Sequence, residues 1–279
     1  MKNYVIIGNS IAGTSAVKAI REIDKENKII LISDEKYLNY SRPLISYLLA
    51  QKVSSDRLNY LPNDFYQKNN VELLLNKKAL KLDIKDKNVL LNDKSKIKYD
   101  KLLLATGGTA IIPQISGLDC EGVFNFMKLS DIEKIEKYLK KNKVKKSVVI
   151  GAGLIGLKAT EALMNINIKV SIIEIADRIL PMTFDKQASE IYEELLKIEG
   201  CEIILNNSAV EIRQDSKSKV CEVILKDDKK IKTDLVIIAT GVRPNIELAQ
   251  GTEISTNRGF LVDKKMRTNI DDIYAAGDC

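Results

Sequence analysis

The chain has 279 residues, of which 45% are apolar and 29% are charged, and it contains no histidine. This length allows two domains with cores of their own, and the composition is that of an ordinary globular protein. The absence of histidine excludes histidine-based acid–base catalysis and histidine metal sites. No apolar run approaches the length of a membrane-spanning helix, which is about 20 residues.

The formal net charge of +6 is spread along the chain. Two lysine pairs, Lys140-Lys141 and Lys145-Lys146, stand without the interleaved aromatic residues on which nucleic-acid bases stack. We therefore expect no nucleic-acid partner and no membrane partner. We interpret these lysines as a solvated rim, with docking of an acidic protein partner as the alternative.

The four cysteines lie too far apart for a metal or redox motif, so we expect cytosolic thiols without a role and no metal site. They are Cys120, Cys201, Cys221 and Cys279. The first three residues lead directly into a strand with no signal-peptide pattern, which predicts a cytoplasmic location.

Strands alternate with helical patterns, which is typical of α/β folds with parallel sheets. The first apolar strand, residues 4–7, runs into a glycine-rich turn from Gly8 to Gly13. We predict that a helix over 11–26 and a strand over 28–33 follow. Further strands are predicted at 71–75, 79–84, 87–91 and 102–105, the last of which runs into Ala-Thr-Gly.

The same plan is repeated after residue 146. A strand over 147–150 runs into a second glycine-rich turn, Gly151 to Gly156, and a strand over 235–239 runs into Ala-Thr-Gly again, at Gly241. Helices are predicted at 130–141, capped by Ser130 or Asp131, and at 188–199, stopped by Gly200. The remaining strands are predicted at 202–205, 210–213 and 220–225.

Residues 260–262 and 273–275 are predicted to return to the first domain. The fold prediction is therefore α/β with two Rossmann-like dinucleotide-binding domains, the second inserted into the first. The predicted boundaries are 1–112 with 242–279 for the first domain, and 113–241 for the second.

A strand that ends at a glycine-rich turn before a helix forms an anion site, because free backbone N–H groups and the helix dipole favour a pyrophosphate. In the second turn, Gly151 allows the tight turn, Gly153 the close approach of phosphate, and Gly156 the packing of helix on strand. Leu154 and Ile155 complete this predicted cofactor-binding turn.

A carboxylate follows the next strand of the second unit. Glu174 lies 23 residues after Gly151, and an acidic residue at this place binds the ribose hydroxyls of NAD and repels a 2′-phosphate. Arg178, four residues further on, suits a 2′-phosphate instead. We therefore expect NADH at this site, with NADPH as the alternative.

The first turn departs from the three-glycine pattern. Ser10 stands where the second glycine belongs, between Gly8 and Gly13, and it is followed by Ile11 and Ala12. Serine is small and its hydroxyl can donate to phosphate, so we expect the site to function. We predict that Glu35 binds the ribose. The alternative interpretation is that Glu35 is a surface-loop carboxylate without a role in binding.

Six segments in this order resemble the FAD-dependent pyridine nucleotide–disulfide oxidoreductase superfamily. They are Gly8–Gly13, the Tyr-Ser-Arg-Pro run at 40–43, Tyr99–Gly107, Gly151–Gly156, Ala239–Asn245 and Ala276–Asp278. The resemblance covers essentially the whole chain and is greatest to the NADH-dependent rubredoxin, ferredoxin and nitrite reductase flavoproteins. It implies a glutathione-reductase-like fold, FAD in the first site and NAD(P)H in the second.

The resemblance also implies roles for single residues at the cofactor sites. It implies that Asp278 binds the flavin ribitol, that Arg42 and Pro43 lie along the FAD, and that the backbone of Ala79 meets its adenine. The remaining residues that it assigns to cofactor binding are Thr106, Gly107 and Gly241.

This chain departs from the superfamily at several positions. No cysteine precedes Cys120, so the paired cysteines after the first turn and the single cysteine in the 39–43 loop are both absent. Lys158 stands where relatives often carry a glutamate, Tyr47 stands where some carry a lysine, and Leu154 replaces a common aromatic residue. The chain ends where relatives continue, so we expect the C-terminal interface domain to be missing and a full-length form to be a possible homodimer.

With no cysteine at either place and no convincing acid–base side chain, we expect no catalytic residue beyond the cofactors. The leading hypothesis is hydride transfer from NADH to FAD, followed by electron transfer to an acceptor such as rubredoxin, ferredoxin or another iron–sulfur protein. The alternatives are a flavin-holding subunit or NADH-responsive redox sensor without fast turnover, and a chain that binds NAD without FAD.

Overall fold

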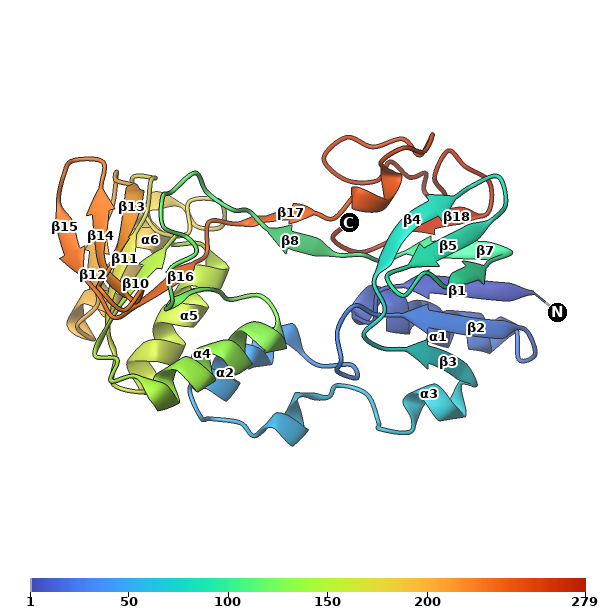
Figure 1. Ribbon diagram of the computed structural model, residues 1–279, viewed down its shortest axis with the longest axis horizontal. Coiled ribbons are helices and arrows are strands. Elements are labelled where there is room, and N and C mark those ends of the chain that lie inside the picture. Colours follow the sequence, from blue (N-terminus) through green and yellow to red (C-terminus); the bar gives the residue numbers. More distant parts are fainter. Residues whose placement is uncertain (1) are drawn as a thin grey trace. The chain divides into compact units, whose positions relative to one another are not determined.

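The computed structural model describes residues 2–279, which divide into two compact α/β units (Figure 1). The first consists of the residues up to Ser41, Asn59–Thr109 and Val242–Cys279, and the second of Arg42–Leu58 and Ala110–Gly241. Over the described residues, each unit contains a five-stranded parallel sheet and a three-stranded antiparallel sheet. This confirms the predicted α/β fold in which one plan is used twice.

The parallel sheet of the first unit has the strand order β18-β7-β1-β2-β3. Side chains alternate between its faces, so Val5 and Ile7 pack with the antiparallel strands while Ile6 packs with the helices. The elements are β1 (Asn3–Ile7), α1 (Ile11–Ile23), β2 (Lys28–Ile32), α3 (Phe65–Lys68), β3 (Val71–Leu74), β4 (Ala79–Asp83), β5 (Asn88–Leu91), β6 (Lys96–Lys98), β7 (Lys101–Leu104) and β18 (Ile273–Ala275).

The parallel sheet of the second unit has the order β12-β11-β10-β16-β9. Val148 and Ile150 pack on the antiparallel strands, and α5 packs on β10, β11 and β16. The elements are α2 (Ile45–Leu49), β9 (Val123–Asn125), α4 (Leu129–Lys141), β10 (Lys146–Ile150), α5 (Leu154–Asn165), β11 (Lys169–Ile173), α6 (Lys186–Ile198), β12 (Glu202–Ile204), β13 (Ala209–Gln214), β14 (Val220–Leu225), β15 (Lys230–Lys232) and β16 (Leu235–Ile238).

Short elements complete the fold. The strands β8 (Gly108–Ala110) and β17 (Val242–Pro244) pair with each other. Among the described residues, 3₁₀ helices span Arg42–Leu44 (η1), Ser55–Leu58 (η2) and Glu247–Ala249 (η3). No helix within residues 2–279 combines the length and the apolar character needed to cross a membrane.

Helix ends differ from the predictions where a side chain binds the backbone. The helix α4 begins at Leu129 with Lys128 as its N-cap, so neither Ser130 nor Asp131 is the N-cap residue that the sequence predicts. Asp131, at the third helical position, accepts the N–H groups of Met127 and Lys128, each at 3.0 Å. The first helix ends at Ile23, three residues early, and the Asp24 carboxylate then accepts the next free N–H groups of the turn.

Candidate functional site

The two glycine-rich turns share one backbone frame. The N–H of Gly8 donates to the last carbonyl of β2 at 2.9 Å, and the N–H of Gly151 donates to the last carbonyl of β11 at 2.8 Å. The two φ angles are +124° and +106°. A Cβ would lie 2.0 Å from the carbonyl oxygen of Ala105 at Gly8, and 2.3 Å from that of Ala239 at Gly151. Both positions therefore require glycine, and the sequence repeat is a structural repeat.

Each turn leads into a helix whose N-terminus has no side-chain cap. The N-cap residues Ser10 and Gly153 make no capping hydrogen bond through a side chain. The first helical residues, Ile11 and Leu154, are each 62% exposed. The first-turn N–H groups of α1 and α5 are therefore suited to an anion such as a pyrophosphate, as the sequence predicts.

The second turn has room for a phosphate. No atom lies within 4 Å of a Cβ built at Gly153, whereas one built at Gly156 would meet the carbonyl oxygen of Gly151 at 1.9 Å. Ile155, between them, is half-buried. The open space at Gly153 and the crowding at Gly156 match the predicted roles of these glycines, so the residues of this turn fit a dinucleotide.

The C-terminal segment lies against the first turn, within the first unit. A Cβ at Gly277 would be 3.1 Å from the Cβ of Ala12, and the N–H of Ala276 donates to the carbonyl of Leu104 at 3.0 Å. The next residue, Asp278, is exposed. The structure thus brings the predicted ribitol ligand next to the turn that contains Gly13.

The closing strand β7 ends beside the same turn. Thr106 Oγ1 donates to the carbonyl of Asn245 at 2.6 Å, and the N–H of Asn245 donates to the carbonyl of Gly107 at 2.8 Å. Gly107 has φ +63° and no atom within 4 Å of a Cβ built there. These contacts fix the backbone of the Ala-Thr-Gly segment and leave its surface open to a ligand.

The acidic residue of the first site is displaced from its counterpart in the second. The strand registers place Ser33 at the position of Glu174, so Glu35 lies two residues beyond it. Glu35 Oε2 accepts the hydroxyl of Tyr40 at 2.7 Å. The N–H of Lys77 donates to the carbonyl of Ser33 at 2.9 Å, so the residue two positions before Ala79 is bound to this acidic segment.

Glu174 is buried and binds the backbone with both oxygens. Oε2 accepts the N–H of Ala152 at 2.6 Å, and Oε1 accepts the N–H of Ala176 at 2.9 Å. Sequence reasoning did not foresee these bonds. Because an ionised carboxylate has about four acceptor positions, ribose hydroxyls can still bind to Glu174.

The loop after Glu174 is tied to the same turn. The N–H of Leu180 donates to the carbonyl of Ala152 at 2.9 Å. Arg178 Nη1 pairs with Asp177 Oδ1 at 2.9 Å, and Nη2 donates to the carbonyl of Pro181 at 3.4 Å. The guanidinium that suits a 2′-phosphate is thus bound to a neighbouring carboxylate.

Arg42 and Pro43 belong to the second unit, and Arg42 Nη1 donates to the carbonyl of Met127 at 3.3 Å. Pro43 is exposed. Gly241, with φ +118°, accepts the N–H of Ile111 at 3.0 Å through its carbonyl. The roles of these three residues toward a cofactor stay predictions.

A buried network beside the first turn was missed by sequence reasoning. The hydroxyl of Tyr66 donates to Asn9 Oδ1 at 2.7 Å, and the N–H of Asn39 donates to that hydroxyl at 3.2 Å. Asn39 Oδ1 in turn accepts the N–H of Leu61 at 2.9 Å. Asn9, Asn39 and the segment 61–66 lie far apart in the sequence, and no local pattern indicates their contact.

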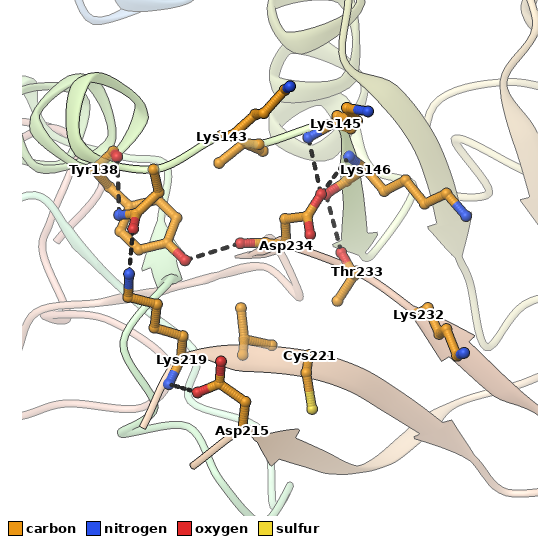
Figure 2. A pocket seen from close by; sticks show the side chains of 13 residues that line it. Tyr138, Lys143, Lys145, Lys146, Asp215, Lys219, Cys221, Lys232, Thr233 and Asp234 are labelled. Carbon is orange, nitrogen blue, oxygen red and sulfur yellow. Dashed lines mark hydrogen bonds between the residues drawn. The ribbon is translucent and has the colours of Figure 1, made fainter. Parts of the chain in front are cut away.

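A second candidate is an open hollow of the second unit, lined by residues of α4, β10, β14 and β15 (Figure 2). Asp234 Oδ2 accepts the N–H groups of Lys145 and Lys146 at 2.8 and 3.0 Å, while the ammonium groups of Lys143, Lys145, Lys146 and Lys232 point away from that carboxylate. The hollow lies at the start of β10, whereas the glycine turn follows its end. A molecule bound in the hollow is therefore at the opposite edge of the sheet from the dinucleotide turn.

Comparisons with known proteins agree with this geometry. The family model described as pyridine nucleotide-disulphide oxidoreductase matches residues 2–279. An NADH oxidase of Methanocaldococcus jannaschii is 36% identical over 282 residues, which cover 99% of this chain and 62% of that protein. A rubredoxin-NAD(+) reductase of Alcanivorax borkumensis is 33% identical over 281 residues, which cover 100% of this chain and 72% of the relative.

Among solved structures, an NAD-dependent persulfide reductase from A. fulgidus superposes with a TM-score of 0.93 at 31% identity. The match covers 99% of this chain and 53% of that one. The chain spans less than two thirds of the length of the M. jannaschii relative. The repeated glycine turns, the order of the strands and these matches confirm the resemblance in the sequence: the chain belongs to the pyridine nucleotide-disulphide oxidoreductase family.

Proposed function

We propose that the chain is an NAD(P)H-dependent flavin oxidoreductase that binds FAD in its first unit and NADH in its second. The observation that carries this proposal is the pair of uncapped, glycine-framed helix N-termini, one in each unit. One such turn is suited to one pyrophosphate, so two turns are suited to two dinucleotides. Bound FAD would accept a hydride from NADH and pass its electrons on.

The residues of the first unit support FAD there. Asp278 is exposed beside the turn that holds Ala12, as a ribitol ligand has to be. The open surface at Gly107 gives a flavin room to approach the backbone. Glu35 and Ala79 are proposed to bind the adenosine end, because both follow strands that end near Ser33.

The residues of the second unit favour NADH over NADPH. Glu174 places a buried carboxylate beside the turn, where a 2′-phosphate would bring further negative charge. Arg178, the cation that could offset that charge, is already paired with Asp177. We therefore propose that NADH is the preferred donor and NADPH the weaker one.

The electrons leave without a cysteine. Burial raises the pKa of Cys201 to about 12 and raises the pKa of Cys120, Cys221 and Cys279, so thiolates are scarce near neutral pH. We propose an external one-electron acceptor of the rubredoxin or iron–sulfur kind, which the A. borkumensis relative's name supports. The name of the M. jannaschii relative supports oxygen as the competing acceptor.

The proposal is tested by steady-state turnover of the FAD-loaded chain with NADH. Rubredoxin, ferredoxin, oxygen and an artificial dye are compared as acceptors under identical conditions. We expect NADH-dependent reduction of rubredoxin or ferredoxin to exceed that of oxygen at least about tenfold. If flavin stays bound but NADH supports the reduction of none of these acceptors, the proposal of an enzyme is contradicted, and a flavin-holding subunit or redox sensor is favoured.

A further inference from the structure

The segment Arg42–Leu58 is fastened to two helices of the second unit. Its helix α2 packs against α4 and α5, with Ile45, Ser46 and Leu49 buried. At its beginning, Arg42 donates to the carbonyl of Met127, which lies two residues before α4. The segment therefore has a defined place on the helix that begins at the second glycine turn.

One contact in this packing joins α5 to α2 through a cation and an aromatic ring. Lys158 Nζ lies 5.4 Å from the centre of the Tyr47 ring, a cation–π contact between α5 and α2. The same ammonium donates to Glu161 Oε2 at 2.6 Å. Glu161 Oε1 lies 3.9 Å from Lys52 Nζ, so one carboxylate links the helix to the segment a second time.

The contact lies close to the nucleotide turn. Residues 154, 158 and 161 share one stripe of α5, because residues four and seven apart lie on one face of a helix. Leu154 begins this stripe at the exposed helix N-terminus, and Lys158 follows about 6 Å along the axis. A ligand of the turn and the segment 42–58 thus meet the same face of α5 one turn apart.

The contact between Lys158 and the Tyr47 ring is additional to the ion pair that Lys158 makes with Glu161. Lys158 is 48% exposed, and Glu161 alone would satisfy it as an ordinary pair three residues apart on a helix. The hydrogen bond from Lys158 to Glu161 raises the pKa of the lysine, so the cation persists at every physiological pH. The charge that the Tyr47 ring attracts is therefore present throughout that pH range.

We propose that Lys158 and Tyr47 are positioning residues for hydride transfer, which hold the segment Arg42–Leu58 at a fixed place relative to the nucleotide turn of α5. The inference rests on the proposed function. Since Arg42 begins the segment, loss of the contact displaces Arg42 and Pro43 relative to the bound NADH. A displacement of this kind slows the reaction of bound reactants without weakening the binding of NADH at Gly153 and Glu174.

The test is anaerobic stopped-flow reduction of the FAD-loaded chain by NADH. The variants are Tyr47→Leu and Lys158→Met, with Tyr47→Phe and Lys158→Arg as conservative partners that keep the ring and the cation. Lys186→Met is the matched control, because Lys186 lies on α6 of the same unit and its contact with Glu190, at 3.9 Å, is solvent-exposed. Bound FAD is measured from the visible absorbance of each variant.

We expect the limiting rate to fall about tenfold or more in Tyr47→Leu and Lys158→Met, with half-saturating NADH unchanged within about twofold. Tyr47→Phe, Lys158→Arg and Lys186→Met should stay within about twofold of the parent. The double variant Tyr47→Leu/Lys158→Met should be no slower than the slower single variant, because the two residues act as one contact.

Unchanged limiting rates in both single variants, or losses that multiply in the double variant, would overturn the inference. An equal loss in Tyr47→Phe would assign the effect to the hydroxyl and would also overturn it. A parent protein whose flavin NADH does not bleach would instead contradict the proposed function, so the two failures are distinguishable.

Discussion

Glu174 Oε2 accepts the backbone N–H of Ala152 at 2.6 Å, and this bond ties the acidic residue of the second unit to its glycine turn. The other oxygen accepts the N–H of Ala176 at 2.9 Å, so one buried carboxylate fixes both the turn and the loop after β11. Glu174 thus shapes the site and also presents charge to whatever binds there.

Replacing Glu174 separates these two roles. Glu174→Ala leaves two backbone donors without their acceptor and removes the charge that faces the ribose, so we expect NADH to bind about tenfold to a hundredfold more weakly. NADPH should lose far less, since the same change removes a repulsion. Titrations with each nucleotide, followed by flavin absorbance, measure both affinities. Equal losses would mean that Glu174 only shapes the turn.

Two glycines of one turn should respond oppositely to alanine. Gly153→Ala finds open space, so the unfolding midpoint should stay within about 1 °C while NADH binding weakens at least tenfold as the methyl group meets phosphate. Gly151→Ala places a Cβ 2.3 Å from the carbonyl oxygen of Ala239 at φ +106°, so it should destabilise the protein by about 3 kcal/mol. Thermal unfolding followed by circular dichroism and titration with NADH test both predictions. A Gly151→Ala variant as stable as the parent would contradict the predicted strain in the turn.

Arg21 is a buried cation that serves the fold. Its guanidinium donates to the carbonyls of Asp24, Asn27, Asn69 and Asn70 at 2.6 to 3.2 Å. Arg21→Met leaves several buried carbonyls unsatisfied, so we expect a loss of about 3 kcal/mol in the free energy of unfolding.

The control for Arg21 is Lys28→Met, because Lys28 pairs with Glu72 on the surface and such pairs contribute about 0 to 1 kcal/mol. Urea unfolding followed by circular dichroism compares the two variants. Similar midpoints for Arg21→Met and Lys28→Met would show that the arginine network contributes nothing to stability.

The four thiols should be dispensable. Burial raises each thiol pKa above its usual value, so the reactive thiolate is rare at pH 7 and increases only as the pH rises toward the pKa. We expect slow labelling by iodoacetamide at pH 7, faster labelling at pH 9, and an unchanged rate of flavin reduction by NADH after labelling at pH 7. Loss of that rate in proportion to one labelled cysteine would identify a redox thiol.

The repeated turns could be predicted because their sequence signal is local. Gly8 and Gly151 occupy positions where positive φ and a close carbonyl oxygen exclude any side chain, so the chemistry of one residue fixes the structure. The apolar strands and the helices that follow each turn are likewise local patterns. Together with the order of the motifs, they were sufficient for the α/β fold and the family.

The remaining features depend on contacts that no local pattern carries. Lys158 and Tyr47 are 111 positions apart in the sequence, and no hydrophobic periodicity spans that separation. Tyr66 on α3 donates to Asn9 in the first glycine turn, and Glu174 accepts the N–H of Ala152 only because the parallel sheet brings the ends of β10 and β11 together. The N-cap of α4 was misplaced for a simpler reason. Ser130 and Asp131 are both good N-cap residues, but the helix begins earlier, after Lys128, and Asp131 instead accepts the N–H of Lys128 from the third helical position.

The proposed function depends on the reduction by NADH of a flavin that this chain holds. The most direct measurement is an anaerobic titration of the FAD-loaded protein with NADH and then with NADPH, followed by the visible absorbance of the flavin. We expect stoichiometric bleaching by NADH at low concentration and weaker bleaching by NADPH. Yellow flavin that remains bound and unbleached at saturating NADH would contradict the proposed function.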